Sequence, residues 1–283
     1  MKYKPFGATG VDLPVIGQGT WDIPERGARA EEAKRAIRRG IELGMTHLDT
    51  AEMYGSGAVE ELLGQAIAGI PRRSLFITSK VLPSNATFKK TIASCERSLK
   101  RLGTDYLDCY LLHWPSSEPL EETMRALAQL VHDGKTRFAG VSNFDVDEMF
   151  EAKALLDPIP LACNQVLYHL HERSIEHRLI PQAGAADIAI VAYTPFGRGR
   201  FPVKASREDG VLGSIAKKHG ATPRQVILAF LTRESNAFTI PKASRIEHVE
   251  ENAGAADVVL DDEDIATIYA AFPIGDERPL ATL

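Results

Sequence analysis

The sequence lacks the features that mark membrane, secreted and zinc-binding proteins. No segment approaches the roughly 18 consecutive apolar residues that a membrane-spanning helix needs, and residues 1–7 lack the apolar core of a signal peptide. The three cysteines, Cys95, Cys109 and Cys163, lie far apart, and the sequence has no CxxC pair or Cys/His cluster. This spacing excludes a disulfide scaffold and a zinc finger. We therefore expect a cytoplasmic protein that binds neither a membrane nor a metal.

A strong excess of one charge is also missing. The net charge is −5, and acidic and basic residues are mixed along the chain. The strongest basic groups, within residues 34–39 and 97–101, stand at helical spacing beside acidic residues, which is typical of a solvated helix face. We therefore expect no nucleic-acid partner. No pattern in the sequence indicates an obligate interface, and we expect a monomer.

The glycine-rich fingerprint of an open, doubly wound dinucleotide-binding sheet is absent as well. After the first strand candidate, residues 15–17, the chain reads Gly17-Gln-Gly-Thr-Trp-Asp22, without the third glycine and without a following helix. Instead, eight short apolar segments alternate with helical patterns. Strands that are apolar on both faces are typical of a parallel sheet covered on both sides. Right-handed βα repeats of this number predict one (β/α)₈ barrel domain over residues 1–283.

Hydrophobic periodicity and the positions of glycine and proline place the individual elements. The expected strands cover residues 15–17, 45–48, 75–78, 106–112, 137–141, 161–166, 188–192 and 237–240. The expected helices cover residues 28–43, 57–68, 87–101, 119–131, 145–155, 174–184, 209–219, 223–233, 245–255 and 262–271. Two short strand-like pieces around Gly7-Ala-Thr-Gly10 predict a hairpin ahead of the barrel.

A polar residue closes nearly every apolar segment. In sequence order these residues are Asp49, Lys80, His113, Ser142-Asn143, Asn164-Gln165, Tyr193 and Lys242. Taken singly, each has an ordinary explanation, such as a helix cap, a solvated lysine or a histidine satisfied in the core. Barrel enzymes, however, place their chemistry at the C-terminal ends of the strands. We therefore expect these side chains to converge on one rim.

The residue types on this rim favour proton transfer to a carbonyl oxygen. Lys80 and Asp49 can form an ion pair, and the lysine charge is expected to lower the pKa of Tyr54 from about 10, which makes the tyrosine a proton donor. His113, neutral or charged, can hydrogen-bond the carbonyl oxygen. A side chain cannot donate a hydride, so the reaction requires a nicotinamide cofactor.

The remaining rim residues suit that nicotinamide. Ser142, Asn143 and Gln165 can hold its carboxamide, and Tyr193 offers a ring on which it can stack.

The sequence resembles the aldo-keto reductases over essentially its whole length, and among them the bacterial enzymes that reduce small aldehydes such as methylglyoxal. The matching motifs are Leu48-Asp-Thr-Ala-Glu-Met-Tyr-Gly55, Thr78-Ser-Lys80, Tyr106-Leu-Asp-Cys-Tyr-Leu-Leu-His-Trp114, Gly140-Val-Ser-Asn-Phe144, Asn164-Gln-Val166, Tyr193-Thr-Pro-Phe196 and Ile240-Pro-Lys242. The resemblance implies a (β/α)₈ barrel with the hairpin closing its bottom, extra C-terminal helices, and NADPH-dependent reduction of aldehydes and some ketones to alcohols.

The resemblance also implies roles for individual residues. The catalytic tetrad would be Asp49, Tyr54, Lys80 and His113, with Tyr54 as the general acid. Trp21, Trp114 and His113 would line the substrate pocket. The implied cofactor contacts are Gly19, Thr20, Ser142, Asn143, Gln165, Tyr193, Pro195, Lys242, Ser244, Arg245, His248, Glu251 and Asn252.

One position in the cofactor segment departs from the family pattern. Lys242 and Ser244 match the segment that binds the adenosine 2′-phosphate, and Glu251 and Asn252 match its adenine end. The arginine usual in the family falls on His248, and the neighbouring Arg245 can take its place because a guanidinium binds phosphate bidentately. NADPH is therefore expected as the cofactor rather than NADH.

Two short segments bear on the substrate pocket and the cofactor. The loop after His113 is short, and only residues 274–283 follow Pro273, which predicts an open pocket for small, varied carbonyl compounds. The basic stretch from Gly197 into a loop ending near residue 210 fits either a cofactor clamp or a solvated turn.

Two other functions remain open on the sequence. One is a barrel lyase in which Lys80 forms a Schiff base. The other is a non-catalytic member of the family that binds or senses NADP(H).

Overall fold

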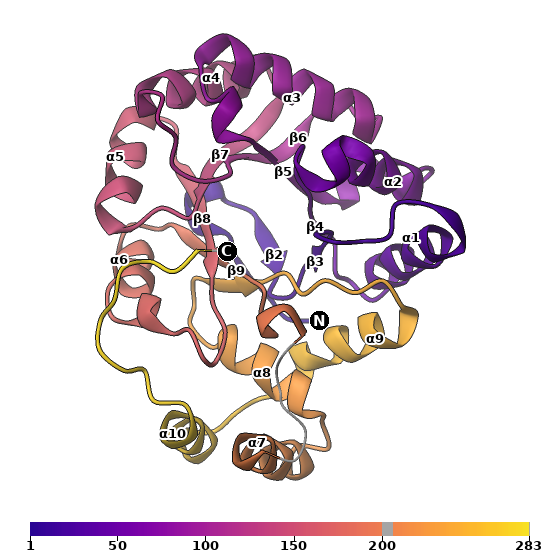
Figure 1. Cartoon of the computed structure of the whole chain (residues 1–283), viewed down its shortest axis with the longest axis vertical. Helices are drawn as coiled ribbons and strands as arrows, with labels where there is room; N and C mark the ends of the chain where they lie inside the picture. Colours follow the sequence, from indigo (N-terminus) through magenta and orange to yellow (C-terminus); the bar gives the residue numbers. More distant parts are fainter. Residues whose placement is uncertain (200–205, 283) are drawn as a thin grey trace.

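The computed structural model describes residues 1–199 and 206–282, and its centre is a ring of parallel strands (Figure 1). The strands are β3 (Gln18–Gly19), β4 (His47–Asp49), β5 (Phe76–Val81), β6 (Leu107–Leu112), β7 (Thr136–Ser142), β8 (Leu161–Leu167), β9 (Ala189–Tyr193) and β10 (Ala237–Thr239). Each strand pairs in parallel with the next along the chain.

Backbone contacts between the two ends of this sheet close the ring. Ile16 bridges Thr239 and Gly19 bridges Lys242, both in parallel. The amide of Thr239 donates to the carbonyl oxygen of Val15 at 3.0 Å, and the amide of Gly17 donates to that of Thr239 at 2.8 Å. The predicted barrel fold is therefore confirmed, and an open doubly wound sheet is excluded.

The helices surround the barrel (Figure 1). They are α1 (Gly27–Glu42), α2 (Ala58–Ile67), α3 (Phe88–Leu102), α4 (Leu120–His132), α5 (Val146–Leu156), α6 (Leu179–Ala185), α7 (Arg207–Lys218), α8 (Pro223–Leu231), α9 (Ile246–Gly254) and α10 (Asp262–Ala271). The C-terminal helix α10 packs against α7, where Lys218 and His219 contact the carboxylate of Asp264 at 2.9 and 2.7 Å.

The helix predicted at residues 174–184 was wrong in one respect, because the structure divides it. A short 3₁₀ helix covers Ser174–Glu176, and α6 begins at Leu179. Pro181 is the third residue of α6. Proline lacks an amide donor and is tolerated only in the first turn of a helix, so the helix has to begin close to it.

The N-terminal hairpin closes the bottom of the barrel. Its strands β1 (Tyr3–Pro5) and β2 (Asp12–Pro14) pair antiparallel. Phe6 is fully buried, and its ring centroid lies 5.3 Å from that of Phe76 and 5.2 Å from that of Phe238. Since Phe76 begins β5, Phe6 fills the N-terminal end of the barrel, which leaves the opposite end for the polar rim.

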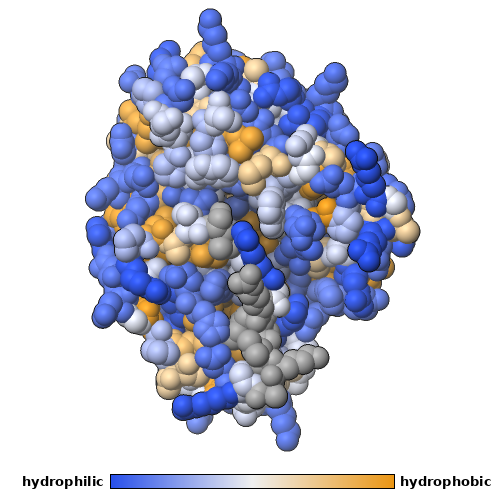
Figure 2. Space-filling model, in the orientation of Figure 1, coloured by the Kyte–Doolittle hydropathy of each residue, from blue (hydrophilic) through white to orange (hydrophobic). Residues whose placement is uncertain are grey.

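The surface of the molecule is predominantly polar on the face shown in Figure 2, with single hydrophobic residues scattered among charged ones. Among the residues described, no helix combines the length and the apolar character that a membrane crossing requires.

Candidate functional site

The C-terminal ends of β4, β5 and β6 bring four polar side chains together. The ammonium nitrogen of Lys80 lies 2.5 Å from Oδ1 of Asp49 and 3.1 Å from the hydroxyl oxygen of Tyr54. It also donates to the carbonyl oxygen of Thr50 at 2.9 Å, and Lys80 has no exposed surface. The ring of His113 lies 5.8 Å from that of Tyr54. The ion pair predicted between Asp49 and Lys80 is therefore present in a site shielded from water.

A glycine-rich turn positions Tyr54 above Lys80. The chain leaves β4 at Asp49 and enters a 3₁₀ turn over Tyr54–Gly57. Gly57 has φ of +98°, and a Cβ atom there would lie 2.7 Å from the side chain of Arg101. Only glycine fits this conformation and this close approach. The turn therefore fixes the position of the Tyr54 hydroxyl relative to the Lys80 ammonium group.

The prediction that Lys80 would lower the pKa of Tyr54 was wrong in its net direction. Burial raises the pKa of the phenol because the tyrosinate loses its hydration, and this effect exceeds the opposing attraction of Lys80. Asp49 adds to the rise. Tyr54 therefore holds its proton at neutral pH, which is the form that a proton donor needs at the start of a reaction.

Burial and the neighbouring groups act in opposite directions on each member of the buried pair. Burial alone would lower the pKa of Lys80, but the charge of Asp49 and the hydrogen bonds with Asp49 and Tyr54 raise it. Burial raises the pKa of Asp49, and both Lys80 and the amide of Gln165 oppose that rise. With three oxygen acceptors around its ammonium group, Lys80 stays a cation and Asp49 balances it.

His113 is neutral in this environment. Burial, with a contribution from the Lys80 charge, lowers the pKa of His113 to about 2. Its Nδ1 atom is buried and has no hydrogen-bond partner among the described residues.

Two tryptophans border the group of four. The ring of Trp21 lies 5.1 Å from that of Tyr54, and the ring of Trp114 lies 4.7 Å from that of His113. They are 45% and 36% exposed, so each offers an aromatic surface to an incoming molecule. The sequence contains no other tryptophan, and both therefore report on this site by fluorescence.

The residues predicted to hold a nicotinamide form one hydrogen-bonded group beside the ion pair. The amide nitrogen of Gln165 donates to Oδ2 of Asp49 at 2.7 Å, and Ser142 donates to the carbonyl oxygen of Gln165 at 2.8 Å. Asn143 Nδ2 donates to the carbonyl oxygen of His113 at 3.0 Å, and Asn143 Oδ1 accepts from the Tyr193 hydroxyl at 2.8 Å. These contacts fix the side chains at the ends of β7, β8 and β9, and Tyr193 keeps a partly exposed ring.

The residues predicted to hold the rest of the cofactor divide into a buried and an exposed set. Gly19, Thr20 and Pro195 are buried, and Thr20 donates to the carbonyl oxygen of Asp49 at 2.8 Å. Lys242 and Arg245 are exposed, and their contacts with Asp22 at 3.9 Å and Glu247 at 3.4 Å are weak.

Helix α9 and the segment before it carry the remaining members of that set. Ser244 and His248 are half-buried and Asn252 is buried. The Glu251 carboxylate accepts from Thr222 at 2.8 Å, so it already has a partner on the neighbouring helix. Exposed cations beside partly open polar groups are suited to an anionic cofactor end. Of the predicted clamp, residues 200–205 lie outside the described part of the chain.

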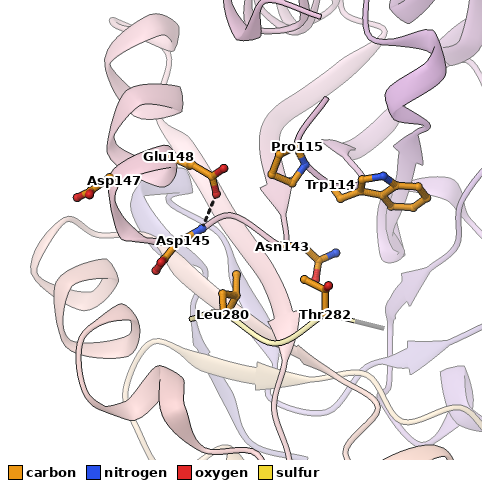
Figure 3. Close-up of a pocket in the computed structure, with 8 residues that line it drawn as sticks. All are labelled: Trp114, Pro115, Asn143, Asp145, Asp147, Glu148, Leu280 and Thr282. Atoms are coloured by element: carbon orange, nitrogen blue, oxygen red, sulfur yellow. Dashed lines mark hydrogen bonds between the residues drawn. The ribbon is translucent and has the colours of Figure 1, made fainter. Parts of the chain in front are cut away.

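A pocket of about 620 Å³ opens beside Trp114, whose ring contacts that of His113, and Figure 3 shows its lining residues. Trp114, Pro115 and Asn143 line it on the barrel side, and Leu280 and Thr282 line it from the C-terminal segment. The expectation that the short C-terminus leaves an open pocket for varied carbonyl compounds stays a prediction, and Leu280 and Thr282 are the part of that segment that lines the pocket. Residues 274–282 are long enough to cross the barrel mouth and form one wall.

Several residues near the site were missed by sequence reasoning. Asp145, Asp147 and Glu148 line the pocket at the start of α5. The Asp145-x-x-Glu148 spacing is a recognisable capping box, but a capping box does not predict a pocket. The fully buried Glu60 accepts from Ser79, next to Lys80, at 2.6 Å and from Arg101 at 2.6 Å. Its burial could not be read from the polar pattern of α2.

In the described part of the chain, no group of three or more histidine, cysteine, aspartate or glutamate side chains is placed to hold a metal ion.

Comparison with known proteins agrees with this geometry. The family model described as "Aldo/keto reductase family" matches residues 15–272. The chain belongs to the aldo/keto reductase family. Methylglyoxal reductase YeaE of Escherichia coli (strain K12) is 41% identical over 263 residues, which cover 93% of this chain and 92% of that protein.

Two solved structures of aldo/keto reductases from Klebsiella pneumoniae superpose over the full length of both chains. One, in complex with NADP and acetate, has a TM-score of 0.92 and 38% identity. The other, in complex with NADPH, has a TM-score of 0.92 and 37% identity. As an aldo/keto reductase with such neighbours, this protein is an NADP-dependent oxidoreductase, the enzyme class that the sequence predicted.

Proposed function

We propose that this aldo/keto reductase reduces small aldehydes to alcohols with NADPH and that Tyr54 is the general acid. The observation that carries the proposal is the position of the Tyr54 hydroxyl, 3.1 Å from the Lys80 ammonium group and beside His113. When bound, NADPH supplies the hydride that the carbonyl carbon receives. Side chains of the protein donate the proton and stabilise the negative charge that develops on the carbonyl oxygen.

The four residues divide this work. Tyr54 gives its proton to the carbonyl oxygen, and Lys80 stabilises the tyrosinate that remains. Asp49 balances the lysine charge and, with the Thr50 carbonyl group, fixes its direction. The neutral imidazole of His113 can donate one N–H to the carbonyl oxygen and so orient the substrate.

The residues around the tetrad fit the cofactor. Ser142, Asn143 and Gln165 would hold the nicotinamide carboxamide, and the partly exposed ring of Tyr193 would stack on the nicotinamide. Lys242 and Arg245, both exposed and weakly paired, would meet the 2′-phosphate. The preference for NADPH over NADH rests on these two cations.

The similarity to methylglyoxal reductase YeaE supports a small aldehyde as the substrate. The pocket of about 620 Å³ falls in the size range of small-molecule sites. A Schiff-base lyase is disfavoured because Lys80 is buried, paired and cationic, whereas a nucleophilic lysine must lose its proton.

The Tyr54→Phe variant tests the proposal. It removes only the hydroxyl, so NADPH should still change the fluorescence of Trp21 and Trp114. NADPH oxidation with methylglyoxal should fall by about 10²- to 10⁴-fold, the range for loss of a general acid. Near wild-type turnover would refute the assignment. Normal NADPH binding by wild type, without turnover on any aldehyde of a panel, would favour a sensing protein.

A further inference from the structure

The pocket beside the tetrad has an acidic wall. Asp145, Asp147 and Glu148, at and just after the N-terminus of α5, are three of its lining residues, although Figure 3 shows the Asp147 carboxylate turned away from the others. Among residues 1–199 and 206–282, no lysine, arginine or histidine lines the pocket. None of the three carboxylates forms an ion pair within residues 1–199 and 206–282. The negative charge of these carboxylates therefore acts on any ligand that enters the pocket.

The start of α5 cannot serve as an anion site. Amide groups at a helix N-terminus attract anions, but here carboxylates of the helix and its cap already accept from these amide groups. The Asp145 carboxylate accepts from the amide of Val146 at 2.7 Å, and the Glu148 carboxylate accepts from the amide of Asp145 at 2.9 Å, as drawn in Figure 3. A carboxylate on the substrate would find these donors occupied and two negative charges beside them.

The other side of the pocket favours the opposite charge. Trp114 lines it with a side chain that is 36% exposed, and the indole lies next to His113, where the carbonyl group would bind. An aromatic face together with carboxylates is the combination that recognises ammonium groups. The pocket thus has on one side the Trp114 indole, whose ring lies 4.7 Å from that of His113, and on the other side the acidic residues at the start of α5.

We propose that this pocket selects aldehydes by charge, favouring substrates with an ammonium group near the carbonyl group over those with a carboxylate there. This inference rests on the proposed function, because it assigns the substrate class of the same site. The cationic end would lie between the Trp114 indole and the Asp145 and Glu148 carboxylates while the carbonyl oxygen meets Tyr54 and His113.

The test compares two matched pairs of aldehydes. Trimethylammonioacetaldehyde and 3,3-dimethylbutanal have the same shape and differ in one positive charge. Succinic semialdehyde and its methyl ester differ in one negative charge. For each pair, the ratio of kcat/KM values is measured in the wild type and in Asp145→Asn/Glu148→Gln, so that differences in aldehyde hydration cancel. Asparagine and glutamine keep the helix cap, and only the charge is lost.

The variant should change both ratios in opposite directions. The preference for the cationic aldehyde should fall about three- to tenfold, as expected for removing two charges several ångströms away in partly screened surroundings. The kcat/KM of succinic semialdehyde relative to that of its methyl ester should rise. The control Asp262→Asn/Glu263→Gln makes the same charge change in the first turn of α10, at exposed residues, and should leave both ratios unchanged.

Unchanged ratios in Asp145→Asn/Glu148→Gln, with normal reduction of 3,3-dimethylbutanal, would overturn the inference while leaving the proposed function intact. A wild-type protein that reduces no aldehyde would refute the proposed function instead. In that case, tryptophan fluorescence titrations with choline and its neutral analogue 3,3-dimethylbutan-1-ol still decide the charge preference. Equal affinity for the two alcohols would overturn the inference, and tighter binding of choline that is lost in the variant would support it.

Discussion

The hydroxyl oxygen of Tyr54 lies 3.1 Å from the ammonium nitrogen of Lys80, inside a site where the lysine has no exposed surface. A cation so close to a buried phenol stabilises the tyrosinate that forms when the proton leaves. The phenol is nevertheless protonated at neutral pH, because its burial raises the pKa more than the lysine lowers it. The Tyr54 phenol therefore keeps its proton at neutral pH, which the proposed role of general acid requires.

The buried pair of Lys80 and Asp49 should respond to mutation as a unit. Lys80→Met leaves the Asp49 carboxylate buried without a counter-charge, so we expect the free energy of unfolding to fall by about 3–5 kcal/mol. The double variant Asp49→Asn/Lys80→Met removes both charges and should recover most of that loss. Urea denaturation measures both changes. Turnover should remain low in both variants, and a double variant no more stable than the single one would contradict a charged pair.

His113 should remain neutral throughout the working pH range. Burial, with help from Lys80, lowers the pKa of His113 to about 2, so its imidazole should not titrate between pH 8 and 4.5. NMR of the ¹⁵N-labelled ring, assigned with His113→Gln, follows this directly. The acidic limb of any pH–rate profile should then come from another group. A midpoint near pH 6 for His113 would show that the site is more hydrated than its burial implies.

His47 should make stability depend on pH. It is fully buried in the barrel, and burial lowers its pKa to about 3. In the unfolded chain the imidazole of His47 is protonated below about pH 6.5, whereas in the folded protein it stays neutral. The free energy of unfolding therefore falls as the pH falls below about 6.5. We expect His47→Gln to remove about 2 kcal/mol of the loss between pH 7 and 5. Urea denaturation at both pH values measures it, and the exposed His132→Gln should leave the loss unchanged.

Glu60 should stabilise the strand that carries Lys80. Its buried carboxylate accepts from Ser79 and Arg101, so Glu60→Ala leaves both donors without their partner. We expect a loss of about 2–4 kcal/mol in the free energy of unfolding. The neighbouring Glu61 is exposed on the same helix, and Glu61→Ala should cost less than about 0.5 kcal/mol. Thermal and urea unfolding of the two variants give the comparison, and equal losses would show that Glu60 has no special role.

Arg245 should distinguish NADPH from NADH. It is exposed, and its contact with Glu247 at 3.4 Å is weak, so its guanidinium group is free to turn toward a phosphate. Arg245→Gln should raise the KM for NADPH about 10- to 100-fold, as expected for losing a charged hydrogen bond. The KM for NADH should not change. His248→Gln is the matched control, and a larger effect there would move the phosphate site to the position where the family has its arginine.

The sequence by itself determined the fold and which residues are near one another. Apolar segments covered on both faces can only be parallel strands beneath helices, and the C-terminal ends of such strands meet at one rim. The positions of Asp49, Lys80 and His113 at the ends of such strands therefore predict that these side chains lie together. The helix around residues 174–184 was misjudged because Pro181 is tolerated only in the first turn of a helix, and α6 therefore begins at Leu179.

Only the tertiary structure decided the electrostatics of the site and the shape of its pocket. The direction of the Tyr54 pKa depends on whether burial or the Lys80 charge is stronger, and burial is a property of the whole packed barrel. The pocket depends on the path of the C-terminal segment, which brings Leu280 opposite Asn143 although the two are far apart in the sequence. Periodicity and spacing report which face of an element is apolar, but they do not report how distant segments close over one another.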